Sequence, residues 1–305
     1  MLPAAPAKVV VPPIKCQGIK TKLVPFIMRH VRWDGRGRWI EPFLGSGVVL
    51  FTAQPPRALV ADTNPHIIAF YRALYEGKIT PQHVQEYLTA EGRKLAQIGA
   101  DYYYEVRARF NAHPNPLDFL FLNRASFNGL MRFNQKGAFN VPFCRKPERF
   151  RPAYVTKIAN QVANVQRVMA GKTWEFRVAD WRETLAMVRP EDFVYLDPPY
   201  AGRHADYYSR WGEEDAKQLA EVAAQLPCGL ALSLWKENKF RRNPYLAAWA
   251  SFTVERTFEH FYHLGATENL RHTMTEALLI KREYAVPRTA APSTPEQLPL
   301  AFPTD

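Results

Sequence analysis

The chain has 305 residues, and its 40 lysines and arginines against 29 aspartates and glutamates give a formal net charge of +11. This length suits one sizeable α/β core with a smaller inserted or appended module, because single cores stop growing at roughly 250 to 300 residues. The basic excess suits a polyanionic partner such as nucleic acid, but charge alone does not name it, since many basic proteins carry only a solvated cationic surface.

Cysteine spacing and hydropathy exclude several other classes. Cys16, Cys144 and Cys228 are far apart and lack a nearby cysteine or histidine pair, so neither a zinc site nor a disulfide framework is indicated and a reducing cytosol fits best. Prolines interrupt the N-terminal segment before a signal-type apolar run develops, and no later stretch approaches the roughly 18 apolar residues of a membrane span. We therefore expect a soluble, intracellular protein.

The first predicted elements form a βαβ unit. Residues 38–41 indicate a strand that runs into the glycine turn at 42–47 and then into an apolar helix from Val48. A short buried strand follows at 58–61 and ends at Asp62. An acidic residue about 20 positions after a glycine turn is the arrangement that binds a ribose in doubly wound sheets.

An insertion then divides the α/β pattern. Residues 64 to about 95 show helical periodicity, and residues 118–157 become aromatic, Asn-rich and basic. Strand-like patterning resumes at 174–178, 193–196 and 230–235, and the segment after Tyr284 is rich in Pro, Ala and Thr, as disordered tails are. We therefore divide the chain into a first α/β part (1–75), an inserted module (76–170), a second α/β part (171–285) and a disordered tail (286–305).

The motif Asp197-Pro198-Pro199-Tyr200 directly follows an apolar strand, where open α/β sheets bind ligands. The Asp197 carboxylate and the Pro198 carbonyl form an acceptor pair that suits the two hydrogens of a base amine, and the two prolines hold this pair rigidly. Tyr200 offers a flat face on which an extruded base can stack. The alternative is an ordinary proline turn at the end of a strand.

The segment Glu41 to Gly47, EPFLGSG, has glycines that let the backbone approach a ligand closely. It departs from G-x-G-x-x-G and lacks the Lys-Ser/Thr of a phosphate loop, and an acid stands at the strand end, which disfavours pyrophosphate. That acid, together with Asp62 after the next strand, suits a cofactor with a cationic amine and a free ribose. S-adenosylmethionine is such a cofactor.

Together these residues resemble the Dam-like family (D12 class, alpha-group) of DNA adenine-N6 methyltransferases over about residues 13–282. The markers are, in family order, QGIK at 17–20, EPFLGSG at 41–47, DTNPH at 62–66, the Asn-rich run at 123–143, ADW at 179–181 and DPPY at 197–200. The resemblance implies a Rossmann-like α/β methyltransferase sheet with an inserted, mainly helical target-recognition domain. The catalytic residues that it implies are Asp197, Pro198, Pro199 and Tyr200.

The resemblance also assigns the cofactor contacts. Gly18 and Lys20 belong to the N-terminal cofactor motif, although Cys16 and Ile19 stand where the family often has Trp and Gly. Phe43 and the glycine turn cradle the methionine portion, Asp62 binds the ribose, and Asp180 with Trp181 binds the adenine, unless Asp180 is only a helix cap. The predicted cofactor-binding set is Gly18, Lys20, Glu41, Pro42, Phe43, Gly45, Ser46, Gly47, Asp62, Asn64, Asp180, Trp181 and Asp197.

The insertion carries a concentrated positive charge, in which eight lysines and arginines between 124 and 157 face only Glu148. Such a density is typical of phosphate binding, and Asn and Arg are the side chains that read adenine and guanine edges. The predicted DNA-binding set is Arg124, Asn128, Arg132, Asn134, Lys136, Arg145 and Lys146. The resemblance makes Arg132 the best candidate for a base contact, and the alternative for some of the Asn and Gly residues is a role in turns only.

We therefore expect a monomeric, S-adenosylmethionine-dependent enzyme that flips adenine out of a short duplex motif and methylates its N6 without a metal. A cytosine-N4 methyltransferase is the nearest alternative, because the same acceptor pair serves either amine. An RNA-base methyltransferase and a catalytically silent DNA-binding specificity module are weaker alternatives.

A short apolar segment stands out in the polar tail: Gln297, Leu298, Leu300 and Phe302. It resembles the Q-L-x-L-x-F peptides that dock on bacterial sliding clamps. Such a tether would raise the local concentration of the enzyme on replicating DNA. The alternative is a chance apolar patch in disorder.

Overall fold

The computed structural model describes residues 8–16, 18, 20–199, 211–238, 242–261 and 273–287. Within these residues the strands form one seven-stranded sheet of order β3-β2-β1-β4-β5-β7-β6. Its first five strands are parallel, and β7 is antiparallel to both β5 and β6. The strands are β1 (Trp39–Glu41), β2 (Arg57–Asp62), β3 (Thr173–Val178), β4 (Phe193–Leu196), β5 (Gly229–Asn238), β6 (Thr253–Phe261) and β7 (Thr273–Lys281).

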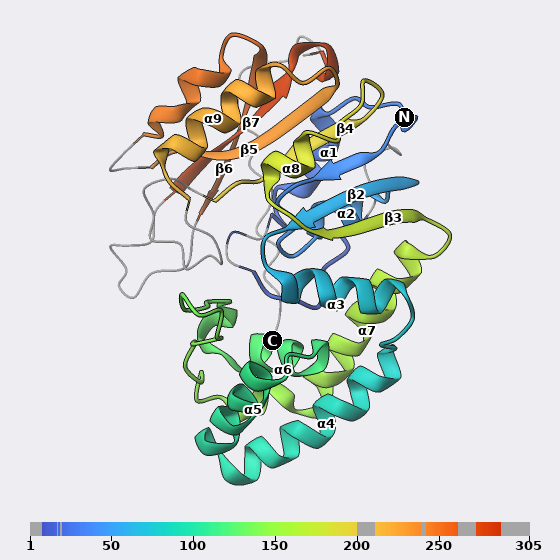
Figure 1. Ribbon diagram of the computed structural model, residues 1–305, viewed down its shortest axis with the longest axis vertical. Coiled ribbons are helices and arrows are strands. Elements are labelled where there is room, and N and C mark those ends of the chain that lie inside the picture. Colours follow the sequence, from blue (N-terminus) through green and yellow to red (C-terminus); the bar gives the residue numbers. More distant parts are fainter. Residues whose placement is uncertain are drawn as a thin grey trace.

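The strands alternate their side chains between two apolar layers, one on each face of the sheet. Trp39, Val60 and Phe193 belong to the larger core, whereas their chain neighbours Ile40 and Leu59 belong to the smaller one. This is the alternation that a strand imposes when both faces are covered. Helices α1 (Val24–His30), α2 (Val48–Ala53) and α3 (Pro65–Tyr75) lie on the first face, and α8 (Trp181–Leu185) and α9 (Glu213–Ala224) lie on the second (Figure 1).

The segment between β2 and β3 forms the helical part of the molecule, which lies at one end of the sheet (Figure 1). It contains α4 (Pro81–Ile98), α5 (Ala100–Ala112), α6 (Pro116–Ala125) and α7 (Pro152–Met169), with 3-10 turns at Phe127–Gly129 and Pro147–Phe150. The predicted fold class, an α/β sheet with a mainly helical insertion, is confirmed. No helix among the described residues is both long and apolar enough to cross a membrane.

The structure adds two details about the elements that the sequence patterns did not specify. The helical periodicity of residues 64 to about 95 belongs to two helices, α3 and α4, because Gly77 takes a left-handed φ of 71° after α3 and Thr80 caps α4 with Pro81 at its first position. Strands β6 and β7 were not predicted at all. Their pattern is interrupted by polar residues that the antiparallel edge of the sheet accommodates.

The helical part and the sheet share one continuous core. Phe70 and Leu74 of α3 belong to the same apolar cluster as Leu88 of α4, Val165 of α7 and Trp174 of β3. Helix α3 therefore connects the βαβ unit formed by β1, α2 and β2 to the insertion through packed side chains rather than through a linker.

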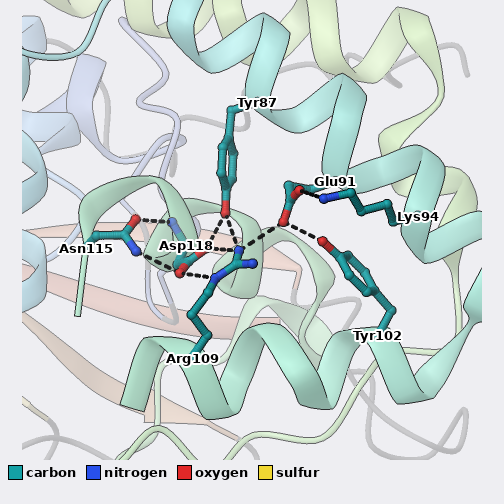
Figure 2. A network of polar contacts seen from close by, with 7 residues as sticks. All are labelled: Tyr87, Glu91, Lys94, Tyr102, Arg109, Asn115 and Asp118. Atoms are coloured by element: carbon teal, nitrogen blue, oxygen red, sulfur yellow. Dashed lines mark hydrogen bonds and ion pairs between the residues drawn. The ribbon is translucent and has the colours of Figure 1, made fainter. Parts of the chain in front are cut away.

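A network of polar side chains joins α4, α5 and the start of α6 (Figure 2). The Arg109 guanidinium donates to both Asp118 oxygens, at 2.9 and 2.6 Å, and to Glu91 Oε2 at 2.9 Å. Tyr102 also donates to Glu91, at 2.6 Å, and Asn115 donates to Asp118 at 2.7 Å. Asp118 is 1% exposed and Glu91 is 5% exposed, so both carboxylates depend on these donors in place of water.

The network makes the stability of the helical part depend on pH. Burial alone would raise the pKa of Asp118 and of Glu91, but hydrogen bonds, chiefly from Arg109 and Tyr102, outweigh burial and hold both pKa values below their ordinary range. A lowered carboxyl pKa gives a stabilisation that is complete above the unfolded pKa of about 4 and is lost as the pH falls further.

Replacing Arg109 with methionine should lower the free energy of unfolding by about 3 kcal/mol, because the change leaves two buried carboxylates without their shared cation. Denaturant unfolding at pH 7 measures this loss, and the loss should shrink at pH 4. Arg93→Met, on the exposed side of α4, is the matched control and should change stability by less than about 0.5 kcal/mol. Equal stabilities of the two variants would contradict the assigned role.

Candidate active site

The carboxyl ends of β1 and β4 meet at the point where the sheet changes direction. These strands are neighbours and parallel, with Trp39 opposite Phe193. The chain leaves β1 towards β2 and β3, and it leaves β4 towards β5 on the other side. A crevice outside the carboxyl ends at such a switch point is where open α/β sheets bind ligands. Glu41 ends β1, and Asp197 directly follows β4.

The glycine turn after β1 needs backbone shapes that other residues rarely adopt. Gly45 and Gly47 have φ values of 51° and 74°, and a Cβ on Gly47 would lie 2.5 Å from the Phe51 ring. The buried Ser46 carbonyl accepts a hydrogen bond from the Tyr71 hydroxyl. The turn is therefore fixed from both sides before any ligand arrives.

Asp62, at the end of β2, anchors this turn. One of its oxygens accepts from the Gly45 N–H and the other from the Asn64 N–H, both at 2.9 Å. Asn64 in turn caps α3 by accepting from the His66 N–H at 3.0 Å. Burial raises the pKa of Asp62, and the two N–H donors oppose that rise. Asn64, predicted as a cofactor contact, has at least this structural role.

Lys20 lies against the carboxylate of the Asp-Pro-Pro-Tyr motif. Its Nζ is 3.0 Å from Asp197 Oδ1 and 3.9 Å from Glu276 Oε2, and it donates to the Gly18 carbonyl at 3.2 Å. The Lys20 side chain is 5% exposed, and that of Asp197 is 24% exposed. The predicted cofactor residue Lys20 therefore contacts the predicted catalytic residue directly.

The carboxyl groups of the site hold their protons more tightly than ordinary carboxyls do. Burial raises the pKa of Glu41 to about 8, although the indole N–H of Trp39 donates to it at 2.7 Å and opposes the rise. Burial also raises the pKa of Asp197 to about 6, with Lys20 opposing the rise. These carboxyls would be relieved by a cationic ligand, because an added positive charge favours their ionised forms.

Cys16 occupies the place where the resembling family often has Trp. A Cβ on Gly45 would lie 3.6 Å from its Sγ, so the thiol packs against the glycine turn. Burial, and to a lesser degree the negative charges of Asp62 and Asp197, raise the pKa of Cys16 to about 12, so the thiol stays protonated. It is a space-filling neighbour of the site rather than a nucleophile.

Asp180 and Trp181 begin α8 beside the ends of β2 and β3. Asp180 caps the helix, accepting from the Arg182 N–H at 2.9 Å. Trp181 is 2% exposed, and within the described chain its indole N–H has no hydrogen-bond partner. A buried N–H that lacks a partner suits a site where a polar ligand supplies the acceptor.

Aromatic rings close the site on the side of α9. Trp211 lies edge-on to Phe43, with ring centroids 5.5 Å apart, and 6.4 Å from Trp181. Trp211 and Tyr245 also line a largely apolar pocket against Pro198 and Pro199. Sequence reasoning missed Trp211, although an aromatic residue between the Asp-Pro-Pro-Tyr motif and the next helix was a usable signal.

The basic segment folds into a short irregular hairpin after α6. Bridges pair Ser126 with Phe143 and Phe133 with Phe139. Asn134 Oδ1 accepts from the backbone N–H groups of Lys136 and Ala138 at 2.9 and 3.0 Å, so Asn134 closes a turn. Its predicted base-reading role therefore has to use the amide nitrogen.

The other predicted DNA contacts are on or just below the surface of this segment. Arg132 is half-buried and its Nε donates to Asn140 Oδ1 at 2.8 Å. Asn128 is exposed at a left-handed φ of 54°, next to the Phe127 ring, which is 52% exposed. Arg124 is half-buried. Lys136, Arg145 and Lys146 are exposed.

Lys15 joins this basic surface, and sequence reasoning missed it. Burial, and to a lesser degree the positive charges of Arg124 and Arg149, lower the pKa of Lys15 to about 8. Burial, and to a lesser degree the charge of Arg149, lower the pKa of Arg124 to about 10. Clustered cations that depress one another's pKa create a strongly positive potential, which suits a phosphate or another anion. Lys15 is more than 100 residues from Arg124 in the sequence, so only the fold brings it to this basic surface.

Some predicted residues cannot be placed. Tyr200 and the tail residues Gln297, Leu298, Leu300 and Phe302 lie outside the described residues. Over the described chain, no group of three or more His, Cys, Asp or Glu side chains is arranged to hold a metal ion.

Comparison with known proteins names the family. Residues 17–259 match the family described as D12 class N6 adenine-specific DNA methyltransferase. The retron Ec67 DNA adenine methylase of Escherichia coli is 33% identical over 68% of this chain and 70% of that protein. The DNA adenine methylase of Vibrio cholerae is 33% identical over 69% and 74%, and that of Escherichia coli K12 is 30% identical over 70% and 75%. The chain belongs to the D12 class of N6 adenine-specific DNA methyltransferases.

Proposed function

We propose that the adenine amine is methylated at the carboxyl edge of β1 and β4, with Asp197 Oδ2 and the Pro198 carbonyl as its hydrogen-bond acceptors. The observation that carries this assignment is the position of Asp197, directly after β4 and beside Glu41, at the switch point of the sheet. The family makes adenine N6 the acceptor atom, so the cytosine-N4 alternative is not favoured.

The acceptor pair compensates for the weak nucleophilicity of a base amine. The N6 lone pair is delocalised into the ring, and two acceptors aimed at the amine hydrogens localise it towards the incoming methyl group. S-adenosylmethionine, the methyl donor general to this family, supplies the electrophilic methyl group and its leaving group. N6 gains the methyl and loses one proton. Asp197 is mostly ionised at neutral pH, since its pKa is about 6, and Lys20 favours that ionised form.

The cofactor is assigned to the residues around this edge by their chemistry. Glu41 and Asp62 offer acceptors for an ammonium group and for ribose hydroxyls, and the carboxyl pKa values raised by burial suit a cation. The Trp181 indole N–H, which has no hydrogen-bond partner among the described residues, and the Phe43 ring suit a polar, aromatic adenine. The remaining members of the proposed set are Gly18, Lys20, Pro42, Gly45, Ser46, Gly47, Asn64, Asp180 and Asp197.

The inserted module, residues 76–170, is assigned to target recognition. Its hairpin carries the half-buried Arg132 and the exposed Asn128, which directly follows the exposed Phe127 in the chain. An exposed aromatic ring beside polar side chains suits insertion between bases when one base leaves the helix. Lys136, Arg145 and Lys146 are exposed cations, and Arg124 is half-buried and close enough to Lys15 to lower the pKa of that lysine after the larger effect of burial. These residues are assigned to the phosphates.

Replacing Asp197 with asparagine should lower the single-turnover methylation rate by at least about 10²-fold, because one acceptor oxygen becomes an amide donor. Cofactor binding by calorimetry and duplex binding by fluorescence anisotropy should remain. Asp62→Asn should instead weaken cofactor binding before it affects the methylation rate of the cofactor-bound enzyme. Loss of DNA binding in step with activity in the Asp197 variant would contradict its role.

Arg132 and Lys136 should separate base reading from phosphate binding. Sequencing of modified sites in methylated genomic DNA first identifies the target motif. Arg132→Ala should then weaken binding to that motif by about 1–3 kcal/mol and relax its sequence preference. Lys136→Ala should weaken all duplexes alike and reduce the slope of log affinity against log salt by about 0.9. Equal effects on target and random duplexes for both variants would remove the base-reading assignment from Arg132.

The tail segment with Gln297, Leu298, Leu300 and Phe302 is assigned to a sliding clamp, which would place the enzyme on replicating DNA in a bacterial or phage-infected cell. The support is the sequence pattern alone. The full-length protein should be retained by immobilised clamp, and a version without residues 296–305 should not. Equal retention of the two proteins ends this assignment.

A further inference from the structure

Glu276 is a buried acid at the active site that no step described above uses. It lies on β7, opposite Trp235 of β5, and is 5% exposed. Its Oε2 is 3.9 Å from Lys20 Nζ, and the same ammonium is 3.0 Å from Asp197 Oδ1. One buried cation therefore lies between two carboxylates.

Such an arrangement is costly for stability, since each buried carboxylate loses its hydration. Strand β7 pairs with strands on both sides, so the backbone that carries Glu276 is fixed. Lys20 comes from the irregular segment before α1 and reaches the site through a long side chain. Glu276 is therefore held in a fixed position by its strand, and the position of the Lys20 ammonium depends on its contacts.

Charge balance gives the second carboxylate a purpose. Asp197 and Lys20 alone form a neutral pair, which makes the carboxylate a weaker acceptor. With Glu276 the trio carries a net charge of −1, because two carboxylates share one ammonium. An acceptor with excess negative charge binds the hydrogens of an amine more strongly as positive charge develops on the nitrogen.

We propose that Glu276 is a positioning residue for methyl transfer: it holds the Lys20 ammonium on the Oδ1 side of Asp197, so that Oδ2 and a net negative charge face the target amine. This inference rests on the proposed role of Asp197. It assigns to β7, outside the sequence motifs of the family resemblance, a part in the reaction.

The groups around Asp197 define how its titration reports on Glu276. Burial raises the pKa of Asp197 to about 6, Lys20 opposes the rise, and Glu276 adds to it as a like charge. The other titratable groups coupled to Asp197 are Glu41, Cys16 and Tyr195. Removal of the Glu276 charge should therefore move the acid limb of the rate profile to lower pH, since protonation of Asp197 then needs more acid.

The experiment measures single-turnover methylation of a prebound duplex from pH 5 to 8 with Glu276→Gln, which removes the charge and keeps the shape. The rate at neutral pH should fall on the order of tenfold, the acid limb should move to lower pH, and the cofactor and DNA affinities should change little. Glu276→Asp keeps the charge and should recover part of the rate. Glu255→Gln removes another ion pair, with Lys236 at 2.6 Å, and is the matched control that should behave like the wild type.

Wild-type rate and an unmoved acid limb in Glu276→Gln would overturn the proposal, as would a rate loss that only follows the folded fraction in thermal unfolding. If the amide variant does not fold, Glu276→Met, which is also neutral and similar in length, replaces it, and a wild-type rate with an unmoved acid limb in that variant would also overturn the proposal. Asp197→Asn distinguishes a failure of the role proposed for Asp197 from a failure of the role proposed for Glu276. Full activity of Asp197→Asn would remove the role of Asp197 itself, whereas an inactive Asp197→Asn beside a normal Glu276→Gln would remove only that of Glu276.

Discussion

The parallel pairing of β1 with β4 is the constraint on which the site depends. These two strands are only three and four residues long, yet they bring Glu41 and Asp197 to the same edge of the sheet although the whole helical insertion separates them in sequence. Stacked rings hold the pair from one face, with Trp39 5.1 Å from Phe193 and 6.2 Å from Tyr195. Both strands are completely buried, and a shift of their register would move Glu41 and Asp197 out of their common position at the crevice.

The proposed active site contains unfavourable electrostatic interactions that the rest of the fold offsets. Glu41 and Glu276 are nearly inaccessible to water, and Lys20 is the buried cation nearest Asp197 and Glu276. Burial raises the pKa of Glu41 and of Asp197 above those of ordinary carboxyls. Groups in this condition are stabilised when a cationic ligand or an amine donor arrives, so binding recovers part of the free energy that folding leaves unsatisfied.

The helical insertion packs directly against the part of the fold that carries the candidate site. His66, on the first turn of α3 and just after the Asp62 anchor, stacks on Phe133 with ring centroids 5.0 Å apart. Burial lowers the pKa of His66 to about 4, so this ring is neutral at physiological pH and packs as an aromatic group. Phe133 lies between Arg132 and Asn134 in the hairpin. Helix α3, whose cap residue Asn64 donates to Asp62, therefore also supports the segment proposed to read DNA, and the Arg109 network joins the helices behind it (Figure 2).

The motifs and the strands that carry them could be predicted from the amino-acid sequence. A glycine turn after an apolar strand, Asp62 after the next strand and Asp-Pro-Pro-Tyr after another are local signals, because backbone conformation and strand period are fixed by neighbouring residues. The contacts between distant segments became visible in the folded chain alone: Lys20 with Asp197, Glu276 with Lys20, Trp211 with Phe43, and Lys15 with Arg124. The tertiary structure also gave Asn134 a turn to close and added β6 and β7 to the sheet. These contacts depend on strand order and on packing between distant segments, and no local pattern in the sequence encodes either one.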